Sequence, residues 1–238
     1  MIVLTGDTHR DFTRIETFCR EQDTTRDDLI IILGDAGINY FLDGSDLGLK
    51  RELSLLPVTL LCIHGNHEER PGEIDGYEEM PWHGGLVYCE PDFPNLLFAK
   101  DGEIYQLGGK SALVIGGAYS VDKYYRLRNG LPWFSSEQPS DEIMEYVEAQ
   151  LDRAGWRVDY VLTHAAPLQF EPTWAFLPGL DQRLVDKSTE TWLDTIEKRL
   201  RYEKWFCGHY HIDDQSGPVR IVQDDFIELD AWNPETEN

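Results

Sequence analysis

Six of the seven histidines in this 238-residue chain directly follow the end of a short apolar segment, and His83 is the exception. The six are His9, His64, His67, His164, His209 and His211. In an open α/β sheet the carboxyl ends of the parallel strands meet at one edge, so residues that follow separate strands can meet in space. Asp7, Asp35 and Asn66 also follow such segments, so we expect carboxylate and amide oxygens beside these imidazoles.

These groups lie in five short turns, and apart from Glu68 the turns supply two carboxylates, one amide and five imidazoles. The turns are Gly6-Asp7-Thr8-His9, Gly34-Asp35, Gly65-Asn66-His67-Glu68, Thr163-His164 and Gly208-His209-Tyr210-His211. Imidazole nitrogens and carboxylate oxygens bind zinc, iron and manganese, and the lack of cysteine in the turns argues against a closed structural zinc site. With one histidine left out and one carboxylate shared, each of two ions would receive four protein ligands. The set therefore predicts two-metal hydrolysis.

Short β-rich apolar segments must position these turns, and helical patterns lie between them. The predicted strands cover residues 2–4, 29–33, 58–63, 158–162 and 204–207. One predicted helix carries Phe12, Ile15, Phe18 and Cys19 behind a candidate N-cap at Asp11, and another spans about 143–151 behind Ser140. Alternation of strands with helices is typical of an α/β fold.

The middle of the chain predicts strands without helices, at residues 86–88, 96–99, 103–107 and 111–115, and we expect a second β-layer there. Residues 219–222 and 226–229 predict a further pair of strands. Two sheets packed face to face with helices outside them would fit this pattern. We expect residues 1–238 to form a single domain and residues 234–238 to be a frayed tail.

The five turns, in this order, make the chain similar to the calcineurin-like metallophosphoesterases. The blocks of that family are Asp-x-His, Gly-Asp, Gly-Asn-His-Asp/Glu, a lone His and Gly-His-x-His, and the match runs from Asp7 to His211. Each block alone is weak, whereas the joint pattern is specific. The resemblance implies a four-layer αββα sandwich, in which two packed mixed β-sheets are flanked by helices. It also implies a phosphoester hydrolase in which a hydroxide held between two metal ions attacks phosphorus in line.

Carried over by position, the resemblance assigns two metal sites that share Asp35. The first would use Asp7, His9, Asp35 and His211, and the second would use Asp35, Asn66, His164 and His209. His67 would be catalytic and would give a proton or a hydrogen bond to the leaving oxygen. Glu68 follows it, and from this adjacency we expect Glu68 to orient the His67 ring. Two divalent ions are implied, and manganese, iron and zinc all suit these ligands.

Residues 118–128 concentrate three basic residues and three tyrosines in an acidic chain, and this segment would cover the site. Lys123 or Arg126 would hold a phosphate oxygen while a tyrosine such as Tyr124 packs on the leaving group. The alternative, in which these charges are paired at the surface and the tyrosines pack on the core, stays open. Arg10 is a candidate phosphate contact or a charge that flanks a helix.

Three further features have alternative interpretations. Residues 167–180 are rich in aromatic and apolar side chains, and they would form a pocket wall or, as we prefer, pack over the second sheet. His64 precedes Gly65 and is expected to be structural. His83 is expected to be an ordinary surface residue.

The composition, with 21 basic and 44 acidic residues and a formal net charge of −23, excludes several classes of protein. Such a charge disfavours extended duplex nucleic acid as a partner, although a two-metal site would be locally positive. The four scattered cysteines predict a reducing, cytoplasmic location. The N-terminal residues do not resemble a signal peptide, and no apolar run is long enough to suggest membrane insertion.

We expect a phosphodiesterase that acts on nucleotide-like or small organic substrates. This preference rests on the compact size, the paired histidines of the last turn, and the aromatic and basic segment 118–128. A phosphomonoesterase or protein phosphatase is the alternative within the same chemistry. A catalytically silent scaffold that binds a partner protein is the alternative outside it.

Overall fold

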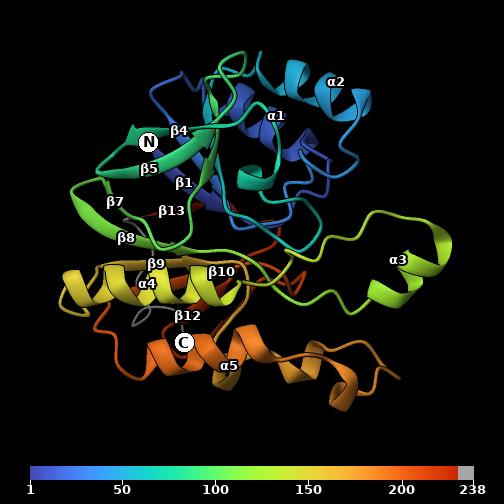
Figure 1. The fold of residues 1–238 in the computed structure, drawn as a ribbon. Helices are drawn as coiled ribbons and strands as arrows, with labels where there is room; N and C mark the ends of the chain where they lie inside the picture. The colour runs from blue at the N-terminus through green and yellow to red at the C-terminus, as the bar shows by residue number, and fades with distance from the viewer. Residues whose placement is uncertain (230–238) are drawn as a thin grey trace.

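Two mixed β-sheets packed face to face form the centre of the computed structural model, which describes residues 1–229 (Figure 1). Helices cover the outer face of each sheet. The predicted four-layer αββα sandwich is therefore confirmed. The expected tail, residues 234–238, lies outside the described residues.

The first sheet has seven strands among residues 1–229, in the order β13-β1-β2-β3-β6-β5-β4. Their bounds are Ile227–Glu228 (β13), Ile2–Thr5 (β1), Leu29–Ile32 (β2), Thr59–Cys62 (β3), Leu96–Ala99 (β6), Gly85–Cys89 (β5) and Glu78–Trp82 (β4). Strands β1, β2, β3 and β6 run parallel. The strands at both edges are antiparallel to their neighbours.

The second sheet has six strands within the described part of the chain, in the order β11-β12-β10-β9-β8-β7. Their bounds are Asp214–Ser216 (β11), Val219–Ile221 (β12), Lys204–Cys207 (β10), Tyr160–Thr163 (β9), Lys110–Ile115 (β8) and Ile104–Leu107 (β7). The four inner strands are parallel, and the two edge strands are antiparallel.

The outer helices divide between the two sheets. Helices α1 (Thr13–Glu21) and α2 (Gly44–Leu53) lie over the first sheet, whereas α4 (Asp141–Arg153) and α5 (Ser188–Glu197) lie over the second. The short helix α3 (Lys123–Asn129) stands out at one edge of the sandwich (Figure 1). Short 3-10 turns lie at Pro71–Glu73, Leu168–Phe170, Thr173–Ala175 and Gln182–Leu184.

The strands are apolar on both faces because each sheet is covered on both sides. In β2, Ile31 packs into the core between the sheets, whereas Ile30 and Ile32 pack outward with Ile15 of α1. All four residues of β2 are buried. A continuous apolar run is what a parallel strand between two layers requires, which is why the runs predicted the strands.

The two predicted helix caps differ in outcome. Ser140 caps α4, because its hydroxyl oxygen accepts a hydrogen bond from the backbone N–H of Ile143 at 3.3 Å. Helix α1 begins at Thr13 with Phe12 at the cap position, so the prediction of Asp11 as the N-cap is wrong by one residue. The Asp11 carboxylate still accepts from the N–H of Thr13 at 3.0 Å.

Residues 86–115 were expected to lie in a second β-layer, which is right for β7 and β8 but wrong for β5 and β6. Strands β5 and β6 extend the first sheet, because β6 pairs with β3, and the chain crosses to the second sheet only before β7. Apolar alternation shows which face of a strand is buried, but it does not show which strand lies beside it. The sequence pattern therefore could not distinguish the two sheets here.

The predicted pairing of residues 219–222 with 226–229 is also wrong. Strand β12 pairs with β10 and β11 of the second sheet, whereas β13 pairs with β1 of the first. The chain between them crosses from one sheet to the other. The Asp213 carboxylate accepts hydrogen bonds from the backbone N–H groups of Gln223 (2.8 Å) and Asp224 (3.1 Å), which stabilises this crossing.

Residues 1–229 contain no helix that is both long and apolar enough to cross a membrane. The four cysteines are free and buried in the described structure.

Candidate metal centre

The predicted site residues lie where the parallel strands of both sheets end. Asp7 and His9 follow β1, Asp35 follows β2, and Asn66 and His67 follow β3. His164 follows β9 of the second sheet, and His209 and His211 follow β10. These side chains follow five separate strands and lie close to one another.

The first group of contacts joins Asp7, His9 and His211. The Nε2 atoms of His9 and His211 lie 2.9 Å apart, and Oδ2 of Asp7 lies 3.7 Å and 3.3 Å from them. The Asp7 side chain is buried. Three atoms that can bind a cation therefore point toward one another, which fits a metal ion.

The second group centres on His164. Its Nδ1 lies 2.8 Å from the backbone oxygen of Leu33, so this nitrogen must carry the proton that the carbonyl accepts. In a neutral ring Nε2 is then an acceptor, yet it lies 2.9 Å from Oδ1 of Asn66. The Asn66 amide is oriented by its Nδ2, which donates to Oγ of Ser120 at 2.9 Å. Two facing acceptors fit a shared cation.

Asp35 connects the two groups. Its Oδ2 lies 3.8 Å from Nε2 of His9, and its Oδ1 lies 3.7 Å from Nε2 of His164. The side chain is buried, which by itself raises the pKa, but the neighbouring His164, His67 and His9 hold the pKa of Asp35 below its usual range. Each oxygen of this ionised carboxyl thus faces a different histidine.

His209 lies beside His164, and the centroids of the two rings are 4.9 Å apart. Its backbone N–H donates to Oδ1 of Asp7 at 3.0 Å. Burial lowers the pKa of His209 to about 3, so the ring is neutral, as a metal ligand must be.

The backbone of the site is unusual. The φ angles of His9 (45°), Asp35 (49°), His209 (70°) and His211 (53°) all lie in the left-handed region, which non-glycine residues rarely adopt. Strained backbone of this kind often occurs at functional sites, where the surrounding structure holds it in place.

Two glycines of the predicted turns allow these side chains to approach. A Cβ atom at Gly65 would lie 1.9 Å from Oδ1 of Asp35, and one at Gly34 would lie 2.0 Å from Nδ1 of His164. Any larger residue at either position would displace a candidate ligand.

His67 lies beside the first group, with its ring edge-on to that of His9 at a centroid distance of 4.9 Å. Nη2 of Arg126 contacts Nδ1 of the His67 ring. Burial lowers the pKa of His67 to about 4, an effect that Asp35 opposes and the charge of Arg126 reinforces. The ring is therefore neutral at physiological pH.

Glu68 does not orient His67 in this structure, so that expectation is wrong. Its Oε2 accepts a hydrogen bond from the N–H of Gly37 at 3.1 Å, and the side chain is buried. Burial raises the pKa of Glu68 to about 8, and the charge of Asp35 adds to this rise. The contact to His67 comes from Arg126 of α3, which sequence adjacency could not indicate.

The four predicted substrate contacts differ in their surroundings. Arg10 is held by the oxygen of Gly37 at 2.7 Å and by Asp46 of α2 at 2.5 Å. Nζ of Lys123 lies 3.9 Å from the centroid of Trp133. Tyr124 is 70% exposed, whereas Arg126 is buried against His67. Of the four, Arg126 has a direct contact with a candidate site residue.

His64 and His83 lie where the sequence predicted. His64 is buried, and its carbonyl oxygen accepts from the N–H of Gly117 at 2.8 Å. Burial lowers the pKa of His64 well below its usual value, so it is a neutral core residue. His83 is exposed, and its ring lies 3.2 Å from the oxygen of Gln106.

A cavity of about 470 Å³ opens beside the site and is lined by Asp35, Asn66, His67, His209 and His211. Part of the segment 167–180 forms its apolar wall, through Ala175, Phe176, Leu177 and Leu180. Phe170 packs instead on the core outside the second sheet. One part of the segment therefore forms a pocket wall, and another part packs over the second sheet.

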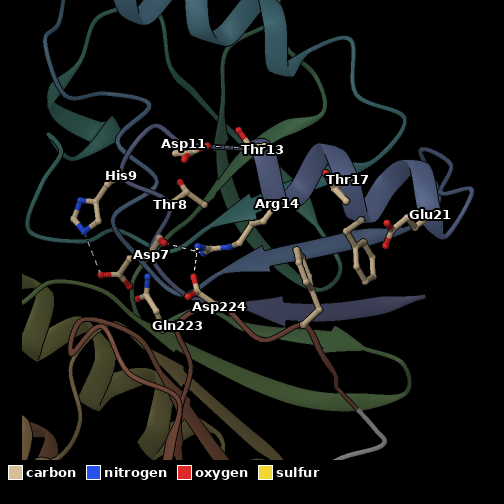
Figure 2. A pocket seen from close by; sticks show the side chains of 12 residues that line it. Asp7, Thr8, His9, Asp11, Thr13, Arg14, Thr17, Glu21, Gln223 and Asp224 are labelled. Atoms are coloured by element: carbon tan, nitrogen blue, oxygen red, sulfur yellow. Dashed lines mark hydrogen bonds and ion pairs between the residues drawn. The ribbon is translucent and has the colours of Figure 1, made fainter.

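Arg14 of α1 supports the site from another side, and the sequence analysis did not identify it. It lines a cavity of about 640 Å³ beside Asp7 and His9 (Figure 2). Its Nη2 donates to the carbonyl oxygens of Gly6 (2.6 Å) and Asp7 (2.8 Å), and Nη1 pairs with Asp224 at 3.1 Å. Figure 2 shows the side chain reaching from α1 to the turn after β1. Arg14 therefore holds the backbone that carries Asp7.

Two solved structures and one family model are similar to this chain. A crystal structure with 13% sequence identity has a TM-score of 0.50, over 93% of this chain and 89% of its own. The crystal structure of TT1561 of Thermus thermophilus has 13% identity and a TM-score of 0.49, over 93% of this chain and 87% of its own. None of the curated proteins matches the chain. The sequence model described as calcineurin-like phosphoesterase matches residues 1–213, and the chain therefore belongs to that family.

Proposed function

We propose that the protein hydrolyses phosphodiesters in preference to phosphomonoesters, at a centre of two divalent metal ions. Family membership supports a metal-dependent phosphoester hydrolase. The observation that carries the two-ion proposal is the position of Asp35, whose two oxygens face His9 and His164 separately. A carboxylate in such a position is suited to bridge two cations.

The proposed ligands follow the assignment that the family resemblance implies. The first ion would be held by Asp7, His9, Asp35 and His211, and the second by Asp35, Asn66, His164 and His209. Nitrogen and oxygen ligands suit manganese, iron and zinc alike, so availability would decide among these metals. When bound, such ions would supply positive charge for the phosphate and lower the pKa of a water molecule.

The charge balance around the site supports a phosphate ester as substrate. Two divalent ions against Asp7 and Asp35 would leave a local charge of about +2. The net charge of the whole chain is −23, but at physiological salt charges beyond about 8 Å are largely screened. The centre would therefore attract a phosphate that the distant surface repels.

His67 is suited to donate a hydrogen bond to the leaving oxygen. Its Nδ1 faces the Arg126 guanidinium, which can only donate, so in the neutral ring the proton resides on Nε2. The Nε2–H group would then stabilise the negative charge that develops on the departing oxygen, an effect that is worth about 100- to 1,000-fold in rate. Arg126 would act by fixing the tautomer and orientation of His67.

The preference for diesters is supported by two cavities that share His67. One is the cavity of about 470 Å³ with the apolar wall. The other has a volume of about 250 Å³ and is lined by His9, Arg10, Gly37, Tyr40 and His67. A diester has an organic group on each side of phosphorus, and each group would have a cavity.

The test uses the protein loaded with manganese, iron or zinc and compares bis(p-nitrophenyl) phosphate with p-nitrophenyl phosphate. We expect a higher kcat/KM for the diester. A clear excess for the monoester would overturn the diester preference and leave a phosphomonoesterase. If the loaded protein hydrolysed neither ester, the proposed function would be wrong.

A further inference from the structure

The cavity of about 470 Å³ has walls of two kinds. His67, His209 and His211 of the candidate centre form one part, and residues 175–180 together with Val185 form a mainly apolar part. Its volume is in the range of pockets that hold small organic molecules. The organic group of a substrate whose phosphate lies at the metal centre would extend into this cavity.

Glu190, in the first turn of α5, is one of the residues that line this cavity. The residue is 2% exposed, and its Oε2 has no hydrogen-bond partner among residues 1–229. Burying an acceptor without a donor costs free energy. An unpaired acceptor among the residues that line a cavity is therefore suited to receive a hydrogen bond from a bound molecule. Burial also raises the pKa of Glu190 to about 7.

The neighbouring polar groups are already engaged with other partners. Nζ of Lys187 forms an ion pair with Glu171 at 2.5 Å and lies 4.6 Å from the centroid of Phe176. The Tyr210 hydroxyl accepts from the N–H of Ala166 at 3.3 Å. Glu171 and Asp186 add negative charge near Glu190, which Lys187 offsets in part. The local field therefore favours a donor or a cation over an anion.

We propose that Glu190 recognises a hydroxyl or amino donor on the leaving group of the substrate, which is otherwise apolar. The proposal rests on the function proposed above and adds the chemical class of the leaving group. A leaving group that lacks the donor would leave Oε2 of Glu190 buried without a partner. Sites built to bind a polar group discriminate strongly against analogues that lack it.

The experiment uses three aryl phosphates of matched size and the metal-loaded full-length protein. The leaving groups are 4-ethylphenol, 4-(hydroxymethyl)phenol and 4-(aminomethyl)phenol, each tested as the methyl diester and as the monoester. We expect the two donor substrates to exceed the ethyl compound by about 10- to 100-fold in kcat/KM. In Glu190→Leu this ratio is expected to fall to about one.

Two variants control for folding and charge. Glu190→Gln keeps an acceptor, so the preference for the hydroxymethyl compound should persist while that for the charged aminomethyl compound weakens. Glu145→Leu changes an exposed residue of α4 and should leave all ratios as in the original protein.

The outcomes separate this proposal from the proposed function. Equal rates for the three leaving groups in the unaltered protein, or a donor preference that survives in Glu190→Leu, would overturn the role of Glu190 and leave the phosphoesterase intact. If no ester were hydrolysed, including bis(p-nitrophenyl) phosphate, both proposals would fall together.

Discussion

Nε2 of His164 lies 2.9 Å from Oδ1 of Asn66, although the remaining contacts make Oδ1 of Asn66 an acceptor and, in the neutral ring, make Nε2 of His164 an acceptor as well. Nδ1 of His164 donates to the oxygen of Leu33, and Nδ2 of Asn66 donates to Ser120. Two lone pairs at this distance repel each other unless a positive charge lies against both. This relationship is a reason to expect a cation between the turns after β3 and β9.

The substitution Asp35→Asn tests the shared ligand. Because Asp35 faces both groups of histidines, its loss should weaken both metal sites at once. We expect the metal content to fall below one ion per chain and kcat/KM to fall by at least about 100-fold. Elemental analysis and diester hydrolysis measure these effects, with exposed Asp92→Asn as the control. A variant that keeps its metal and its activity would disprove the bridging position.

The substitution His67→Ala tests the hydrogen-bond donor. A leaving group that is stable as an anion needs little stabilisation, so p-nitrophenyl esters should lose little rate, whereas phenyl esters should lose about 100- to 1,000-fold. Metal content should not change, because His67 is not a proposed ligand. The measurement is the dependence of kcat on the acidity of the leaving phenol. An equal loss for both esters would show that His67 does not act on the leaving oxygen.

The substitution Arg126→Met tests the positioning of His67. Without the guanidinium at Nδ1, the His67 ring can adopt the other tautomer, so the loss should again be larger for phenyl than for p-nitrophenyl esters. We expect a loss of about 10- to 100-fold for phenyl esters. Arg128→Met, at an exposed position of the same helix, is the control. A loss that is independent of the leaving group would indicate a structural role alone.

The substitution Gly34→Ala tests the close packing at the site. The backbone of Gly34 has φ +101°, and the added Cβ would lie 2.0 Å from Nδ1 of His164. We expect the free energy of unfolding of the metal-free chain to fall by about 3 kcal/mol. Gly48→Ala is the matched comparison, because nothing lies within 4 Å of its Cβ and it is inside α2. It should stabilise the chain by about 0.5–1 kcal/mol. Equal effects in urea unfolding would contradict the packing.

The pH dependence of stability tests the burial of Glu190. The pKa rises from its ordinary value of 4.5 to about 7 in the folded chain, so folding favours the protonated carboxyl. The stability that this proton provides is fully present below pH 4.5 and is lost as the pH rises to about 7. The difference corresponds to roughly 3 kcal/mol.

Comparison with Glu190→Gln isolates this effect, because all other titrating groups are shared. The stability of the original chain relative to the variant should fall between pH 4.5 and 7. If the difference in the free energy of unfolding between the two proteins stayed constant across that range, burial would not raise the pKa of Glu190. Exposed Glu145→Gln should show no such trend.

Much of the site could be predicted because the sequence shows both the buried strands and the polar residues that directly follow them. A strand such as β2, buried on both faces, appears as an unbroken apolar run, and the polar residue that ends the run, Asp35, must lie at the sheet edge. The strands of both sheets that supply His9 and His164 follow the same rule.

The remaining contacts could not be predicted, since they depend on tertiary packing. Arg126 and Glu190 reach the site from α3 and α5, and no local pattern shows how these helices lie relative to the sheets. The spacing of Trp192, Leu193 and Ile196 would have indicated α5, but not the buried position of Glu190. The assignment of β5 and β6 failed for the same reason, because pairing partners are chosen by the whole sheet.

The most direct test of the account is the number of metal ions that the purified chain retains. The metal-free protein would be loaded separately with excess manganese, iron or zinc, desalted and examined by elemental analysis. We predict about two ions per chain for at least one metal, together with hydrolysis of bis(p-nitrophenyl) phosphate. A chain that retained only traces of every metal after loading would contradict the proposed centre.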